Sequence, residues 1–168
     1  MLKMYEIGQK RGKAMNRTEN RKDLMRRYAH LNGEINGIYH DISAAAGISD
    51  SVSYILYTLY VEDRDLTLSE LCDLTGTAKQ TLHSALTKLE KDGVITIIPK
   101  DKKSKLISLT GPGREFTEKT AKKVSDAENA VLGSWSEKDV KTYIELTTRF
   151  RDGLEEQKKS IISELKST

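Results

Sequence analysis

The sequence predicts a mainly α-helical fold that contains one small β-hairpin. Good helix formers dominate the 168 residues, and only 2 prolines and 11 glycines interrupt them. Apolar residues recur at steps of three and four over long stretches. That period changes after Gly93, where two β-branched runs, VITIIP and SKLISLT, flank the segment KDKKS. The expected order is two helices, two short helices, a hairpin and two further helices.

The first expected helix begins at Arg21, and Gly47 ends it. Its apolar residues form one stripe: Leu24, Tyr28, Leu31, Ile35, Ile38 and Ile42. A second helix begins at Ser49 or Asp50, and its apolar density predicts burial on more than one side. Residues 1–20 form a basic arm that either contacts phosphates, packs across a dimer or is a solvated tail.

Two short helices are predicted next, each with its own capping box. TLSE, from Thr67 to Glu70, fits a box in which the threonine and the glutamate satisfy each other's backbone N–H groups. TAKQ, from Thr77 to Gln80, fits a second box. Gly76 supplies the turn between them, so the pair predicts a helix-turn-helix.

The second helix of this pair extends to about Asp92 and has one polar face. Leu82, Leu86 and Leu89 share the apolar face. The opposite face has no acid before Glu90, and it carries Lys79, Gln80, His83, Ser84, Thr87 and Lys88. Base edges offer donors and acceptors while phosphates repel carboxylates, so this face suits DNA.

The hairpin that follows makes the predicted helix-turn-helix a winged one. Its tip carries Lys100, Asp101, Lys102 and Lys103. The lysines either contact DNA or keep the edge of a sheet soluble, and the neighbouring helix-turn-helix favours DNA.

Two helices close the chain. The first follows Thr110-Gly-Pro-Gly and extends to about Leu132. Ser136 caps the second, which extends for about 30 residues and carries a long apolar stripe. That stripe either packs against a second copy of the chain or lies across its own core.

Composition excludes several classes of function. The net charge of +3 permits nucleic-acid binding without requiring it. No apolar run resembles a membrane span or a secretory signal, and the single cysteine suits a reducing compartment, so we expect a cytoplasmic protein. No nucleophile elbow, P-loop or dinucleotide motif is present, so we expect no enzyme. The histidines lack metal-ligand spacing, so we expect neither a metal nor a cofactor.

The segment LTLSELCDLTGTAKQTLHSALTKLEKDGVITIIPKDKKSKLISLTGPG, Leu66 to Gly113, resembles the winged helix-turn-helix of the MarR family of transcriptional regulators. LSEL resembles the first motif helix, TAKQTLHSALTKLEKDG the recognition helix, and DKKSKLISLTGPG the wing with its L-T-x-x-G exit. The resemblance implies a winged helix over 48–110 between dimerisation helices over 21–47 and 111–168. It also implies a cytoplasmic, ligand-responsive repressor that binds a palindromic operator as a homodimer, with a small-molecule effector of unidentified chemistry.

Carried over residue by residue, the resemblance implies two sets of site residues. The DNA-contacting set is Thr77, Lys79, Gln80, His83, Ser84, Lys88, Lys100, Asp101, Lys102 and Lys103. The dimerisation set is Leu24, Tyr28, Leu31, Val140, Ile144, Phe150, Leu154, Ile161 and Leu165. In the family an aspartate of the wing orients an arginine toward the minor groove. Lysine stands here instead, and it lacks the planar fork of arginine, which favours backbone contact.

Some alternatives stay open. Cys72 occupies the position of a small buried residue, so packing is favoured over a thiol-based redox sensor. The tyrosines of the first two helices either belong to the core or line the effector pocket of the family. Finally, a winged helix can serve as a protein-interaction module without binding DNA, which the acid-free polar face disfavours.

Overall fold

A computed structural model describes residues 20–101 and 104–167. The predicted basic arm, apart from Asn20, lies outside the described residues, and so do Lys102 and Lys103. The chain divides into two units, Met1–Asp50 and Ser51–Thr168.

The first unit contains helix α1 (Arg21–Ala45). The side chain of Asn20 caps it by accepting a hydrogen bond from the backbone N–H of Lys22 at 3.2 Å. The helix ends before Gly47, whose φ of 70° is a left-handed conformation that glycine adopts without steric cost. Both predicted ends of this helix are confirmed.

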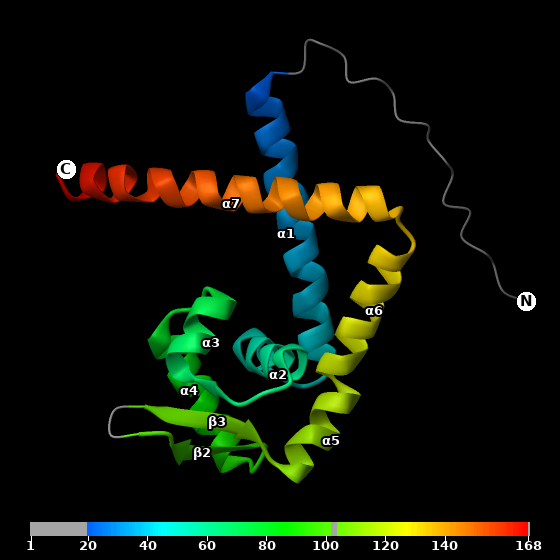
Figure 1. The fold of residues 1–168 in the computed structure, drawn as a ribbon, viewed down its shortest axis with the longest axis vertical. Helices are drawn as coiled ribbons and strands as arrows, with labels where there is room; N and C mark the ends of the chain where they lie inside the picture. The colour runs from blue at the N-terminus through cyan, green and yellow to red at the C-terminus, as the bar shows by residue number, and fades with distance from the viewer. Residues whose placement is uncertain (1–19, 102–103, 168) are drawn as a thin grey trace, which may run out of the picture. The chain divides into compact units, whose positions relative to one another are not determined.

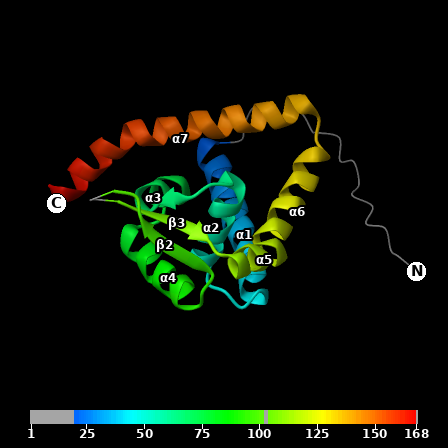
Figure 2. The same cartoon turned by 60° about the horizontal axis from the view of Figure 1, so that its bottom comes forward.

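The second unit begins with a winged helix-turn-helix. Its elements are α2 (Asp50–Glu62), β1 (Leu66–Thr67), α3 (Leu68–Thr75), α4 (Lys79–Lys91), β2 (Ile95–Pro99) and β3 (Lys105–Leu109). Figures 1 and 2 show the β2–β3 hairpin beside α4. The centre of the core consists of fully buried side chains from these elements: Ile55, Leu56, Leu66, Leu71, Leu82 and Ile107. The predicted fold class is therefore confirmed.

One of the two predicted capping boxes is present. The side chain of Thr67 accepts from the N–H of Glu70 at 3.3 Å, and the Glu70 carboxylate accepts from the N–H of Thr67 at 2.8 Å. The second box is wrong, because α4 begins after Ala78 and, within the described residues, has no side-chain cap. The N–H of Thr77 donates instead to the hydroxyl of Thr75 at 3.2 Å, and the Thr77 hydroxyl donates to the Thr75 carbonyl at 3.4 Å.

The sheet contains one strand more than the predicted hairpin. Strand β1 pairs antiparallel with β3, which gives the order β1-β3-β2. The register places Leu66 opposite Ile107 and Ile95 opposite Leu109. Because Leu66, Ile95 and Ile107 are all buried, this register directs one face of the sheet toward the helices.

Two helices, not one, follow the sheet before the long last helix. They are α5 (Gly111–Lys119) and α6 (Ala121–Gly133), and they meet at Thr120. The Thr120 hydroxyl donates to the carbonyl of Phe116 at 2.8 Å, while the Thr120 N–H donates to Thr117 at 3.2 Å. The backbone at Thr120, with φ −124° and ψ −86°, is not helical, so its N–H does not pair with the Phe116 carbonyl as in a continuous helix, and the helix breaks there.

The last helix is α7 (Glu137–Lys166), with 30 residues. The Ser136 hydroxyl accepts from the N–H of Asp139 at 3.1 Å, so the predicted cap is confirmed. No residue of α7 is buried within the described part of the chain, so the alternative in which this helix lies across its own core is wrong. Among the described helices, none has a stretch that is long and apolar enough to cross a membrane.

Candidate nucleic-acid interface

Helix α4 has a fully exposed polar face opposite a buried apolar one. Leu82, Leu86 and Leu89 are at most 3% exposed, and they fix α4 against the core. The predicted contact residues on the other face are all exposed: Lys79, Gln80, His83, Ser84 and Lys88. Exposed Thr81 and Thr87 extend the face, although Thr81 was not among the predicted residues. The structure thus brings five predicted residues to one polar surface.

Thr77 differs from the other predicted contacts. It lies in the turn before α4 and is half-buried, and its hydroxyl donates to the carbonyl of Thr75. Two further hydroxyls of α4 donate to carbonyls one turn back, Ser84 to Gln80 at 3.2 Å and Thr87 to His83 at 2.9 Å. A hydroxyl that has donated its proton presents lone pairs, so these side chains face outward as hydrogen-bond acceptors.

The start of α3 is held by a charged network around Glu70. The backbone and side chain of Thr67, together with the Arg64 guanidinium, lower the pKa of Glu70 from 4.5 to about 2. Arg64 lies 2.8 Å from Glu70 and 3.4 Å from Glu62, and hydrogen bonding to Glu70 raises the pKa of Arg64. This network fixes the start of α3, and α3 in turn packs on α4.

The wing tip is closed by Asp101. Its carboxylate accepts from the N–H of Ser104 at 2.9 Å and from the Ser104 hydroxyl at 2.6 Å. The N–H of Lys100 donates to the Ser104 carbonyl at 3.0 Å, and the Lys100 side chain is exposed. In the described residues the carboxylate thus shapes the tip, a role that the resemblance did not imply. The contacts predicted for Lys102 and Lys103 lie outside those residues.

A cavity of about 700 Å³ opens between α3, α4 and the sheet. Lys79 and His83 line it, and so does Cys72. Cys72 is a free cysteine and is half-buried, not fully buried as its position in the helix predicted. The reason is that only the Leu71 side of the short α3 faces the core.

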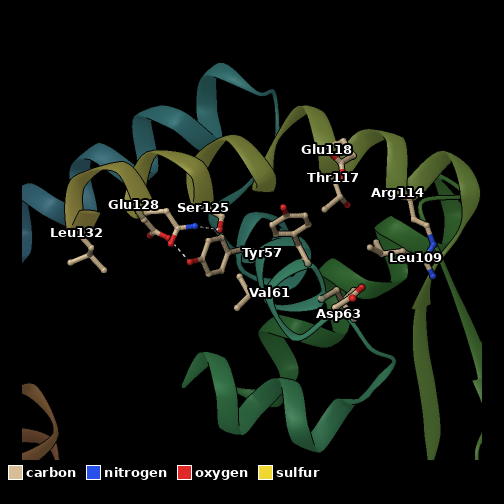
Figure 3. A pocket seen from close by; sticks show the side chains of 13 residues that line it. Tyr57, Val61, Asp63, Leu109, Arg114, Thr117, Glu118, Ser125, Glu128 and Leu132 are labelled. Carbon is tan, nitrogen blue, oxygen red and sulfur yellow. Dashed lines mark hydrogen bonds between the residues drawn. The ribbon is translucent and has the colours of Figure 1, made fainter. Parts of the chain in front are cut away.

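A second cavity, the α2–α6 pocket, is defined by residues of α2, α5 and α6 and has a volume of about 620 Å³ (Figure 3). Tyr57 and Tyr60 of α2 line it, so two of the predicted tyrosines are pocket residues, whereas Tyr54 is exposed. The Tyr57 hydroxyl donates to the carboxylate of Glu128 on α6. Sequence reasoning missed Glu128, because nothing local relates residues 71 positions apart.

Most of the predicted dimerisation residues expose their apolar side chains. Leu24 of α1 and Val140 of α7 are half-buried. The rest are between 38% and 72% exposed: Tyr28, Leu31, Ile144, Phe150, Leu154, Ile161 and Leu165. Trp135 and Tyr143 add an edge-to-face ring contact with centroids 5.5 Å apart at the start of α7.

No group of three or more His, Cys, Asp or Glu side chains within the described ranges is placed to hold a metal ion.

Part of the sequence matches a family profile, and solved structures of MarR family proteins share the fold. Residues 46–104 match the sequence profile of the MarR family. A MarR family regulator from Neisseria meningitidis has a TM-score of 0.70 and 18% identity, over 83% of this chain and 96% of that chain. A MarR/EmrR family transcriptional regulator from Acinetobacter sp. ADP1 has a TM-score of 0.66 and 22% identity, over 79% and 96%.

The MepR–DNA complex from Staphylococcus aureus has a TM-score of 0.61 and 20% identity, over 81% of this chain and 98% of that chain. Among curated proteins, none matches the sequence. Residues 46–104 therefore match the MarR family, and the chain shares the fold of MarR family proteins of known structure.

Proposed function

We propose that the protein is a sequence-specific DNA-binding transcriptional regulator that represses transcription as a homodimer on a palindromic operator. The observation that carries the proposal is the exposed face of α4. It presents hydrogen-bonding and basic side chains without a carboxylate before Glu90, on a helix that Leu82, Leu86 and Leu89 fix to the core. Such a face complements base edges in the major groove and the phosphates beside it.

Within this proposal, α4 is the recognition helix. Lys79, Gln80, His83 and Ser84 read base edges, and Lys88 contacts the DNA backbone. Thr77, half-buried in the turn, contributes at the groove edge. The wing contacts phosphates of the adjacent minor groove through Lys100, Lys102 and Lys103, and Asp101 shapes its tip. The fold similarity to MepR, whose structure contains DNA, supports this assignment.

The second copy of the chain is proposed to cover the apolar faces of α1 and α7. Ile144 is 54% and Leu154 53% exposed, on a helix without a buried residue in the described part of the chain. Large exposed apolar faces indicate association, because removing apolar area from water is favourable. A symmetric dimer would present two recognition helices about 34 Å apart, one turn of DNA.

The α2–α6 pocket is proposed to be the effector site. It borders Leu109 at the end of β3 and Arg114 in α5, directly after the wing. A ligand that shifts α5 would move the wing with it, and this would change the fit of the dimer to its operator. We therefore expect a bound effector to lower the affinity for DNA.

Selection from a random duplex library tests the sequence specificity. The proposal predicts enrichment of a palindrome whose half-sites are one helical turn apart. A library that shows no enrichment at physiological salt would contradict sequence-specific binding. It would favour the protein-interaction alternative.

The wing lysines offer a second test. Replacing Lys102 and Lys103 with alanine removes two cations that are proposed to contact phosphates. Because the proposed dimer carries both lysines on each subunit, we expect weaker binding to every duplex and a slope of log K against log salt that is flatter by about 4. A matched control removes Lys158 and Lys159 of α7 in the same way and leaves both quantities unchanged. Loss of binding to one sequence only would contradict phosphate contact.

A further inference from the structure

We infer that the α2–α6 pocket binds an organic cation with an apolar body. The inference rests on the proposed function, in which this pocket is the effector site, and it adds the chemical class of the ligand. It is carried by the size of the pocket, its charged groups and the geometry of one hydrogen bond.

The size and lining of the pocket suit a small organic molecule. Its volume of about 620 Å³ lies within the range of ligand sites. Leu59 of α2, Leu109 of β3 and Leu132 of α6 supply apolar walls. Leu59 is buried in the core, so that wall is fixed, and an apolar ligand body would displace water from it.

The charged groups of the pocket are mostly acidic. Asp63, Glu118 and Glu128 supply three carboxylates, whereas Arg114 supplies the one cation among the described lining residues. Hydrogen bonding to Asp126, with a smaller contribution from Glu118, raises the pKa of Lys122, so this lysine lies near Glu118 and offsets its charge. Asp63 and Glu128 then exceed the single positive charge of Arg114 by one, and this favours a positively charged ligand.

Tyr57 and Glu128 form the end of the pocket where the cation would bind. The phenol donates to the carboxylate, so the Glu128 side chain is already oriented before a ligand arrives. Figure 3 shows Tyr57 and Glu128 together, with Arg114 toward the opposite end. An aromatic ring next to a carboxylate attracts a cation both through the face of the ring and through the full negative charge.

Asp63 supplies a further carboxylate of the lining. Asp63 has φ of 46°, and it is the residue other than glycine with a positive φ in the described chain. Aspartate tolerates this left-handed conformation better than most residues. The turn directly after α2 thereby brings a carboxylate to the lining of the pocket.

The test compares two probes of nearly the same shape and opposite charge. Tetraphenylphosphonium and tetraphenylborate are titrated into the full-length protein by isothermal calorimetry, without DNA. We expect the cation to bind with micromolar affinity and the anion at least about tenfold more weakly. Equal binding of the two ions, or tighter binding of the anion, would overturn the inference.

Three variants test whether the cation binds in the α2–α6 pocket. Glu128→Gln keeps an acceptor for Tyr57 but removes the charge, so we expect the affinity for the cation to fall about tenfold. Arg114→Gln removes the opposing charge and is expected to strengthen binding. Glu115→Gln, an exposed α5 residue outside the lining, is the matched control and should leave the affinity unchanged. An unchanged affinity in Glu128→Gln would overturn the assignment of this pocket.

The two experiments distinguish a wrong ligand class from a wrong proposed function. If the cation binds with this pattern but the protein does not bind DNA, the ligand class stands and the regulator proposal fails. If the protein binds its operator and the cation does not bind the protein, the ligand class is wrong and DNA binding stands.

Discussion

Replacing Gly113 with alanine tests how the wing is joined to the helices that follow it. Gly113 lies in the first turn of α5, and its N–H donates to the Thr110 hydroxyl at 3.0 Å. A Cβ at this position would lie 1.8 Å from the carbonyl oxygen of Val94, whereas real Cβ atoms stay beyond 3.0 Å. Because the obstacle is backbone, it cannot rotate away as a side chain could.

The expected loss of stability follows from the hydrogen bonding of the Val94 carbonyl. This carbonyl accepts a hydrogen bond from the N–H of Thr110 at 3.1 Å, while the Thr110 hydroxyl, 3.1 Å away, donates mainly to the Gly93 carbonyl at 2.6 Å. Moving the Val94 carbonyl by about one ångström weakens the bond from the Thr110 N–H, at about 1 kcal/mol, and adds overpacking strain of about 1–3 kcal/mol. We expect Gly113→Ala to lower the free energy of unfolding by about 2–4 kcal/mol.

Urea denaturation followed by far-UV circular dichroism measures this loss, at one fixed protein concentration because an associating chain gains stability with concentration. Gly111→Ala is the matched control, since it lies in the same turn with nothing within 4 Å of an added Cβ. We expect this control to be neutral or slightly stabilising. Equal stability of the two variants would refute the close contact with Val94.

Three further predictions concern recognition, pH and association. Gln80→Ala or His83→Ala should reduce discrimination between the operator and point-mutated operators by about 1–3 kcal/mol, measured by competition anisotropy. Uniform weakening on all duplexes would argue against base contact. The pKa of Glu70 is lowered from 4.5 to about 2, so its carboxylate stabilises the fold above pH 4.5, and that contribution is lost as the pH falls toward 2. The difference in unfolding free energy between wild type and Glu70→Gln should shrink over this window, and a constant difference would contradict the network. Leu154→Glu should convert a dimer to a monomer in light scattering, while Lys159→Glu on the same helix should not, and a dimeric Leu154→Glu would contradict the proposed interface.

Local patterns of the sequence predicted the elements whose ends depend on neighbouring residues. The Thr67–Glu70 box, the Ser136 cap and the end of α1 before Gly47 each depend on contacts within four residues or on one glycine, and all are present. The polar and apolar faces of α4 also follow from spacing alone.

Two predictions of helix boundaries were wrong, and in both places the residue spacing did not reveal the local backbone structure. The Thr77–Gln80 pattern fits a capping box, but the hydroxyl of Thr75 takes the N–H of Thr77 and the helix begins two residues later. The break at Thr120 lies at a non-helical backbone conformation, with neither glycine nor proline at that position to mark it.

The sequence analysis missed the features that depend on contacts between distant residues. Strand β1 has two residues, and it forms because Leu66 and Thr67 pair with β3, about 40 positions later in the chain. The α2–α6 pocket likewise depends on α2 and α6 lying together, so Glu128 and Arg114 carried no sequence signal. The domain boundaries, the contact residues and the dimerisation residues stay predictions.

The central claim, sequence-specific DNA binding by the α4 face, is tested most directly by fluorescence anisotropy. The protein is titrated against duplex from the region upstream of its own gene and against scrambled duplex of equal composition, at two salt concentrations. The account predicts nanomolar binding that prefers the upstream duplex, with one dimer per site. Weak and equal binding to both duplexes, lost at physiological salt, would contradict it.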